Sequence, residues 1–178
     1  MTGNVITRPA AVLLALATGL PRNYCRALCA VGFQGLAKGY SWSNVVWLMK
    51  QVRLETGRGS SSGIQEDNNA WGMSCVRVRP TTQVGCRTLP DGNTLGKYRT
   101  VESSVEDRFM WDEYTEGPHR LRKSEAYPGE VNSQGYHPSG IYAFSVSEVD
   151  GTDARNVCLA LASVPIAGVF LGWLMKTK

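Results

Sequence analysis

The segment from Trp42 to Gly59 constrains the fold of this chain more than any other segment. Four of its apolar residues fall at i, i+3, i+4 and i+7, the spacing of one buried stripe along a helix: Val45, Leu48, Met49 and Val52. Ser43 is predicted to cap this helix, because its hydroxyl can accept from a first-turn amide. Gly57 and Gly59 follow the stripe and can adopt the left-handed conformation that ends a helix. The sequence therefore predicts a helix that is buried along one side.

Glu55 lies three residues beyond Val52, so it is expected at the end of the buried side of this helix. A carboxyl group held there loses part of its hydration, which disfavours its charged form and raises its pKa. A raised pKa is what a general acid needs near neutral pH. A solvent-facing Glu at a helix end is the alternative interpretation, which this pattern alone leaves open.

The chain has 178 residues, of which 43% are hydrophobic and 19% charged, so it is long enough for one domain with a core. Its net charge of +4 suits a cell wall or a membrane surface, and no dense basic stripe predicts a nucleic-acid partner. The 5 cysteines are an odd number and do not form a disulfide framework. Cys75 and Cys86 could close a small loop in an oxidising compartment, or could equally remain thiols. Cys25 and Cys29 lack partners for a zinc site and are expected as buried thiols in a helix.

Residues 10–20 are an apolar run that is too short to span a bilayer. The core of a signal peptide is one interpretation, but only Arg8 precedes the run and no clean cleavage site follows it. We therefore favour a buried helix that Pro21 ends. Residues 22–37 allow a second, weaker helix, and the S-S-S-G sequence at 60–63 predicts a flexible loop.

After about residue 68, the sequence pattern changes from helical periodicity to turn and strand patterns. Paired asparagines before an aromatic-Gly step, at 68–72, suit a turn in which side-chain amides bind backbone groups. Short alternating runs between 75 and 98 predict a small β-hairpin region. Ser103, with Glu106 three residues later, predicts a capping box at the start of a helix that ends at 117–118. A last amphipathic segment is expected at about 141–149.

Residues 157–175 contain no charged side chain. At about 1.5 Å of rise per residue, a helix of this length matches the ~30 Å hydrocarbon core of a bilayer. Pro165 and the glycines disfavour the alternative, a buried helix of a soluble core, and both residue types are tolerated in membranes. We therefore expect a transmembrane helix here. Its Gly168 and Gly172 form one G-x-x-x-G pattern, a weak indication of a homo-oligomer.

Four short motifs occur in a particular order. They are L-E-T-G-R-G-S at 54–60, N-N-A-W-G-M at 68–73, Y-R-T-V-E-S-S-V-E-D at 98–107 and G-Y-H-P-S-G-I-Y-A at 135–143. In this order the motifs resemble the glucosaminidase family of peptidoglycan hydrolases, which includes bacterial autolysins and the flagellar rod-associated muramidase. The resemblance covers about residues 42–149 and implies a lysozyme-like domain, in which a glycan chain lies between a helical lobe and a small β-lobe.

The resemblance assigns roles to five residues. Glu55 matches the catalytic acid of the family, and Asn68 and Asn69 match asparagines that shape the floor of the cleft. Tyr136 matches a late tyrosine near the scissile bond, and Tyr142 matches the tyrosine six residues after it. Turn formation and core packing are the alternative roles for the two asparagines. An ordinary hydrogen-bonded tyrosine is the alternative for Tyr136.

The sequence also departs from the family pattern. The family usually carries a second acid in a T-T-E-like segment of the β-lobe, where this chain has Gln83. Asp91, in the next turn, could reach the cleft instead, although the first residue of an Asp-Gly turn is its alternative role. Trp71 and Met73 replace other apolar residues of the N-N motif, and Trp71 is expected to contact sugar or to pack in the core.

These features predict a hydrolase of β-1,4 glycosidic bonds in the peptidoglycan backbone. Glu55 would protonate the leaving oxygen, and Asp91 could position water opposite. If neither Asp91 nor Gln83 serves, the 2-acetamido group of the sugar can act as internal nucleophile. Tyr136 would orient that group or the developing charge. Two alternatives stay open: a lytic transglycosylase of the same fold, and a membrane protein that binds glycan without catalysis.

The expected fold is α+β and mainly α, with a catalytic domain over 1–150 and a membrane helix over 157–175. The expected partners are peptidoglycan strands and a lipid membrane, without nucleic acid, and the chemistry needs no metal or other cofactor. Lysines after the membrane segment favour an enzyme on the outer side of the membrane. Such a single-pass C-terminal anchor suits a bacterial envelope or a bacteriophage with an internal membrane.

Overall fold

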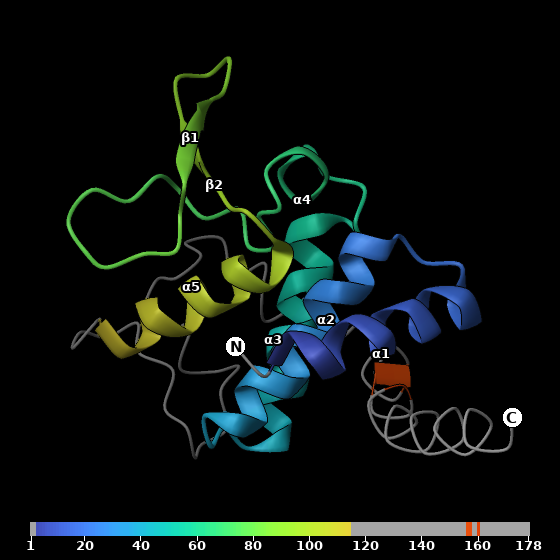
Figure 1. Ribbon diagram of the computed structural model, residues 1–178. Helices are drawn as coiled ribbons and strands as arrows, with labels where there is room; N and C mark the ends of the chain where they lie inside the picture. The colour runs from blue at the N-terminus through green and yellow to red at the C-terminus, as the bar shows by residue number, and fades with distance from the viewer. Residues whose placement is uncertain (1–2, 115–155, 158–159, 161–178) are drawn as a thin grey trace, which may run out of the picture.

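The computed structural model describes residues 3–114, 156–157 and 160. Within this part of the chain the fold is α+β and mainly helical, with one two-stranded hairpin (Figure 1). The elements in order are α1 (Gly3–Thr18), α2 (Arg22–Ala37), α3 (Trp42–Thr56), α4 (Ser62–Glu66), β1 (Gly85–Thr88), β2 (Thr94–Lys97) and α5 (Val101–Tyr114). The predicted fold class is confirmed at this level.

Helix α2 is the element on which the helical part is built. It packs against α1, α3 and α5, and more lightly against α4. Gly35 makes the close approach possible, because a Cβ there would lie 2.8 Å from Cγ2 of Val45 on α3 and 3.4 Å from the ring of Phe109 on α5. The sequence indicated α3 as the organising helix and α2 as a weaker one. The glycines of α2, Gly32 and Gly35, lower its helical propensity, and Gly35 allows α3 and α5 to come close.

Helix α3 confirms the predicted buried stripe. Val45, Leu48, Met49 and Val52 are all buried. The cap was placed wrongly, because Ser41, not Ser43, precedes the first turn and its hydroxyl accepts from the amide of Asn44 at 3.2 Å. At the other end Gly57 takes the expected left-handed conformation, with φ of 53°.

Two further local predictions were wrong. The S-S-S-G segment is not a loop throughout, because α4 begins at Ser62 and buries Gly63 and Ile64. Helix α5 begins two residues before Ser103, and Thr100 caps it by accepting from the amide of Ser103 at 3.2 Å. Burial of Gly63 and Ile64 accompanies the start of α4, and the hydroxyl of Thr100 caps the start of α5. The sequence pattern identified neither start.

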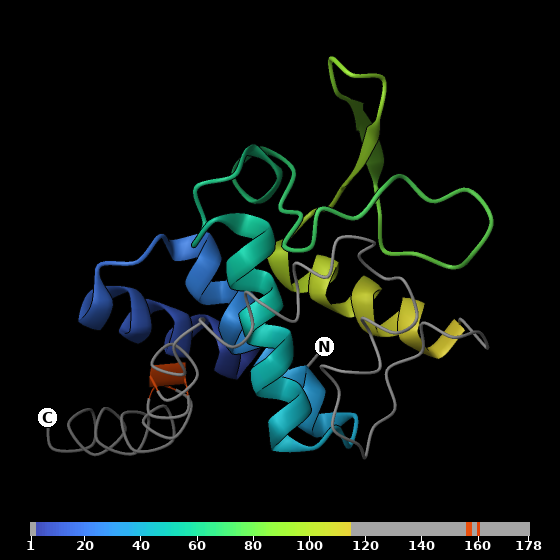
Figure 2. The ribbon, with the colours of Figure 1, turned by 180° about the vertical axis from the view of Figure 1, so that it is seen from behind.

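The predicted hairpin is confirmed as a short antiparallel pair, in which Gly85 pairs with Lys97 and Thr88 with Thr94. It extends away from the helices, as Figures 1 and 2 show from opposite sides. The V-R-V-R sequence at 76–79 is not a strand, and before β1 only an isolated bridge joins Ser74 to Leu95. Residues 74–84 therefore cross the base of the hairpin as irregular chain.

The N-terminal apolar run lies in α1, where Ala10, Ala11 and Leu14 are buried. Cys25 and Cys29 are buried thiols of α2, as expected. Of the segment predicted to span a membrane, the structure describes only Val157 and Ala160, both buried in the apolar core cluster. In the described part of the chain, no helix has the length and apolar character of a membrane span. The segment at 141–149 lies outside the described residues.

Candidate active site

A tight turn fixes the end of α3 and with it the place of Glu55. The hydroxyl of Thr56 donates to the carbonyl of Val52 at 2.6 Å and accepts from the amide of Gly59 at 3.1 Å. Gly59 has φ of 90°, and a Cβ there would lie 2.7 Å from Cβ of Tyr24 at the start of α2. The turn can therefore press against α2 only with glycine at this position.

The carboxyl group of Glu55 is half-buried at this helix end. Burial raises its pKa to about 7, and the positive charge of Arg108 opposes the rise without cancelling it. The group is therefore divided between its acid and its carboxylate form near neutral pH, as a general acid requires. The half-buried position of Glu55 is the one expected from its place after the buried stripe of α3.

Two other buried carboxyl groups, those of Glu102 and Asp107, are held in the ionised form. Burial alone would raise the pKa of Glu102 and of Asp107, but donors outweigh it and hold both pKa values low. Arg26 donates to both oxygens of Glu102, and Arg79 donates to both oxygens of Asp107 at 2.9 and 3.0 Å. Both groups therefore act as fixed anions of structural ion pairs.

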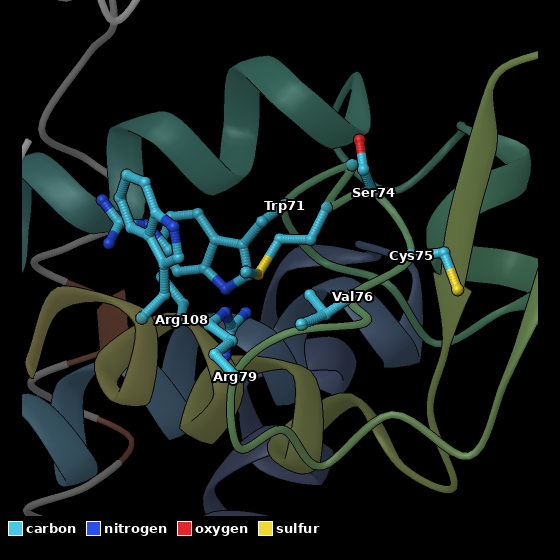
Figure 3. Close-up of a pocket in the computed structure, with 9 residues that line it drawn as sticks. Trp71, Ser74, Cys75, Val76, Arg79 and Arg108 are labelled. Atoms are coloured by element: carbon cyan, nitrogen blue, oxygen red, sulfur yellow. The ribbon is translucent and has the colours of Figure 1, made fainter. Parts of the chain in front are cut away.

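A pocket of about 320 Å³ lies between the chain at 71–76 and helix α5 (Figure 3). Residues 71–76 line it, together with Arg79 from the following loop and Arg108 and Trp111 from α5. Gly72 connects the pocket to the acid, because a Cβ on Gly72 would lie 3.5 Å from Oε2 of Glu55. Gly72 has φ of 62°, so its backbone can take this close path without a side chain.

Arg108 lies between two indole rings of the pocket wall. Its guanidinium carbon is 5.6 Å from the ring centroid of Trp71 and 4.7 Å from that of Trp111. A cation over an aromatic face is attracted by the ring quadrupole, and the attraction grows when water is excluded. Arg108 is only 1% exposed, so the two rings and the charge beside Glu55 form one packed unit.

Asn69 ties together the chain around the pocket. Its amide nitrogen donates to the carbonyls of Met73 and Gly96, at 2.9 and 3.0 Å. Its amide oxygen accepts from the backbone amides of Trp71 and Met73, at 3.3 and 3.0 Å. Asn69 is 1% exposed, so its whole hydrogen-bonding capacity is used inside the protein. This is the turn-forming role, and the pocket floor depends on it.

Asn68 has a similar role at the other side of the turn. It adopts φ of 53° and donates to the carbonyl of Tyr98 at 3.0 Å. Its amide group is therefore directed at backbone near the start of α5, and it does not line the pocket described above.

Gln83 is bound to protein groups on both sides of its amide. Its oxygen accepts from the amide of Val76 at 2.9 Å, and its nitrogen donates to the carbonyl of Ser74 and to the hydroxyl of Tyr98, at 2.9 and 3.0 Å. Tyr98 in turn donates to Asp107 at 2.8 Å. The residue at the position of the expected second acid thus holds the pocket-lining segment in place.

Asp91 lies in the turn between β1 and β2 and is fully exposed. Its carboxylate accepts from the backbone and side-chain amides of Asn93, at 3.0 and 2.9 Å, and these bonds lower its pKa. It does not line the pocket beside Glu55. The structure therefore brings together Glu55 and Trp71 among the predicted residues, and Asp91 lies apart. Tyr136 and Tyr142 lie outside the described residues.

A disulfide joins Cys75 to Cys86, with 5.7 Å between their Cα atoms. It connects the pocket-lining segment to β1. Of the two states that the sequence left open for these cysteines, disulfide and free thiols, the structure has the disulfide. Burial raises the pKa of Cys29 to about 12, so this thiol is not suited to act as a nucleophile. Within the described ranges, no group of three or more potential ligands is placed to hold a metal ion.

Sequence analysis missed Arg108 and Trp111. Both lie on α5, four and seven residues beyond Ser104, where they read as part of a charged helix. Because they lie three residues apart, the two side chains are expected on the same face of the helix. They become part of a pocket only because the chain at 71–76 passes over this face.

No family model matches this sequence, and no curated protein matches it. Among solved structures, the chain is similar to a chain of a type VI secretion system effector-immunity complex from Pseudomonas protegens. The two share 16% identity with a TM-score of 0.43, over 78% of this chain and 98% of that chain. A similarity at this level assigns no function, so the functional argument depends on the site itself.

Proposed function

We propose that this protein is a glycoside hydrolase with a lysozyme-like fold that cleaves β-1,4 bonds of the peptidoglycan backbone, with Glu55 as general acid. One observation carries the proposal: a half-buried carboxyl group with a pKa of about 7 borders a pocket that two indole rings line. Indole rings suit the apolar faces of sugars, and a proton held near neutral pH suits a glycosidic oxygen.

Glu55 would donate its proton to the leaving oxygen, a step worth about 10²–10⁴-fold in rate. The oxocarbenium-like centre that develops needs negative charge or a nucleophile on its other face. None of the described residues lining the pocket is a carboxylate, and Asp91 is held by its own turn. The 2-acetamido group of the substrate is therefore the favoured internal nucleophile, with Tyr136 as the residue expected to orient it.

The absence of a second carboxylate among the described lining residues also favours one rival. A lytic transglycosylase needs a single acid and forms an anhydro sugar without water. Mass spectrometry of the released muropeptides separates the two reactions, because the hydrolase leaves reducing ends and the transglycosylase leaves anhydro ends.

Zymography tests the proposal directly. Purified peptidoglycan is embedded in a gel, and wild-type protein is run beside Glu55→Gln, which removes the proton with little change in volume. We expect clearing by the wild type and a loss of on the order of a hundredfold or more in the variant. A wild type that binds peptidoglycan without clearing it would instead identify a glycan-binding protein.

Val157 and Ala160 pack in the core of the domain, so we propose a tether to a lipid membrane only through the uncharged residues that follow them in the sequence. A tether raises the effective concentration of an enzyme at its substrate, as linkage does for any binding module. Co-sedimentation of the full chain with lipid vesicles tests this part of the proposal, and a full chain that stays in the supernatant would contradict it.

A further inference from the structure

The outer face of α1 carries large apolar side chains. Val12, Leu13 and Leu16 are 39%, 38% and 79% exposed, whereas Ala10 and Ala11 on the opposite side of the helix are fully buried. A helix at the surface of a soluble domain normally turns its larger apolar residues towards the core. The arrangement in α1 is the reverse, and a group of exposed apolar side chains on one face marks a surface that binds a partner.

The charges around this face are positive. Arg8 and Arg22 are both exposed, Arg8 one helical turn before Val12 and Arg22 at the first residue of α2. The first acidic residue of the whole chain is Glu55, so no carboxylate side chain occurs in the stretch that contains α1 and α2. An apolar helix face with basic residues at its ends is typical of a helix that lies on an anionic lipid surface.

The proposed membrane tether begins next to α1. Val157 and Ala160 belong to the same buried cluster as Ala10 and Ala11, and the orange segment lies beside α1 in Figures 1 and 2. A helix over the uncharged residues 161–175 would be about 22 Å long, shorter than the ~30 Å hydrocarbon core. A tether that enters only part of the bilayer needs a second contact with lipid, and the outer face of α1 is close to its start.

The position of α1 is compatible with an active enzyme at a membrane. In both views α1 lies at the edge of the helical part, on the side away from the β1–β2 hairpin. None of the described residues that line the pocket between 71–76 and α5 belongs to α1. A domain that binds lipid through α1 therefore keeps this pocket open to a polymer on the other side.

We propose that the outer face of α1 is a docking surface for an anionic lipid membrane. Val12, Leu13 and Leu16 enter the boundary between headgroups and acyl chains, and Arg8 and Arg22 bind lipid phosphates. The inference deepens the proposed tether, because it adds a surface of the folded domain to the uncharged segment, and it does not depend on the glycan chemistry.

Co-sedimentation of the full chain with vesicles tests the apolar part of the surface. The vesicles contain one part phosphatidylglycerol to two parts phosphatidylcholine. The double variant Leu13→Gln, Leu16→Gln keeps helical propensity and should bind about tenfold more weakly, because two apolar contacts are lost. Wild-type affinity in this variant would overturn the proposal.

The matched control is the double variant Val78→Gln, Val84→Gln, which changes two exposed apolar residues near the hairpin, 87% and 56% exposed. It should bind vesicles like the wild type. Equal losses in the two double variants would mean that exposed apolar residues bind lipid without specificity, and would overturn the role of α1. Circular dichroism and the melting temperature show that both variants are folded.

The arginines give a second, independent test. Arg8→Gln with Arg22→Gln should weaken binding to the phosphatidylglycerol vesicles by about tenfold and leave binding to pure phosphatidylcholine unchanged. A rise in salt concentration should weaken the binding of the wild type to the anionic vesicles in the same direction. Unchanged binding of the arginine variant to anionic vesicles would overturn the preference for anionic lipid.

Leu171→Lys places a charge in the uncharged segment and so tests the tether separately. Loss of binding in Leu171→Lys, with wild-type binding in the α1 variant, would keep the tether and reject this surface. Weaker binding on changing Leu13 and Leu16 both with and without Leu171→Lys would support the surface whether or not the tether inserts. Failure of the hydrolase in the zymogram affects neither result.

Sedimentation velocity without lipid tests another occupant of the same face, a second copy of the chain. We expect the wild type and the Leu13→Gln, Leu16→Gln variant to have the same oligomeric state. A dimer that this variant loses, together with unchanged vesicle binding, would make the face an interface between copies and reject the lipid surface.

Discussion

The end of α3 and the β1–β2 hairpin each present a carboxyl group, and the two groups are opposite in character. Glu55 is held by a helix that packs its apolar stripe against α2, and burial raises its pKa to about 7. Asp91 lies in an exposed turn, where hydrogen bonds from Asn93 lower its pKa. The same functional group is thus a proton donor in one region and a permanent anion in the other.

The difference follows from how each region is held. The helix end is fixed by apolar packing, which desolvates any group placed there. The hairpin is mostly exposed and is fixed by polar cross-links instead: the Cys75–Cys86 disulfide, the amide of Gln83 and the ion pair of Arg87 with Asp67 at 2.7 Å. Apolar packing therefore raises the pKa of Glu55. The disulfide, hydrogen bonds and ion pair of the hairpin region hold the pocket wall beside it.

The pH dependence of lysis gives the largest expected effect. With the pKa of Glu55 at about 7, its protonated form predominates below that pH and falls about tenfold for each unit above it. The rate of peptidoglycan lysis should fall in the same way between pH 7 and pH 9. Lysis rates measured across pH 5–9 in buffers of constant ionic strength check this, and a rate that rises above pH 7 would make Glu55 a base.

Arg108 supplies a control for that profile. Its charge lowers the pKa of Glu55, so Arg108→Gln should move the falling limb to higher pH. Circular dichroism and the melting temperature show whether the variant is folded. A folded variant with an unmoved limb would show that Arg108 does not act on Glu55.

Removal of the disulfide should affect the hairpin region more than the acid. The bond closes a loop with a sequence separation of 11, for which chain entropy gives a stabilisation of about 3 kcal/mol. The double variant Cys75→Ser, Cys86→Ser should lose about that much free energy of unfolding in urea. Its pH profile should keep the midpoint of the wild type, because the packing of α3 does not involve these residues.

Reduction of the wild type is the matched control for the double variant, since the other cysteines of the described residues, Cys25 and Cys29, are already thiols. The same loss of stability is expected from reductant as from the substitutions. A shift in the pH midpoint on reduction would mean that the disulfide also determines the environment of Glu55.

The smallest effect is expected at the hairpin turn. Asp91→Asn removes a charge that is fully solvated, and it should leave the lysis rate unchanged because Asp91 does not line the pocket. Parallel lysis assays of Asp91→Asn and Glu55→Gln measure this contrast. Comparable losses in the two variants would make Asp91 the second catalytic group.

The sequence could predict α3 and the state of Glu55 because both depend on local periodicity. A buried stripe at helical spacing ends at Val52, and a carboxyl group one turn later has to share its environment. The Asn68–Asn69 turn was also predictable, since paired amides suit backbone hydrogen bonds. The roles of individual amides were not predictable, because they depend on which carbonyls the fold brings within reach.

The central place of α2 and the cluster around Arg108 could not be predicted from the sequence. Gly35 lowers helical propensity, and only the approach of Val45 and Phe109 shows why a glycine is needed there. Arg108 and Trp111 have the pattern of a solvated helix face until the chain at 71–76 covers them. Both are long-range effects, on which local spacing carries no information.

Asn69 has a mechanical consequence. Because its single amide group bonds both to the backbone at 71–73 and to Gly96 of β2, the hairpin cannot tilt without moving the pocket floor or breaking these bonds. The base of the hairpin and the pocket floor are therefore coupled through the side chain of Asn69. A load applied to the hairpin tip, such as a stiff polymer pressing on it, would change the distance between the floor and Glu55.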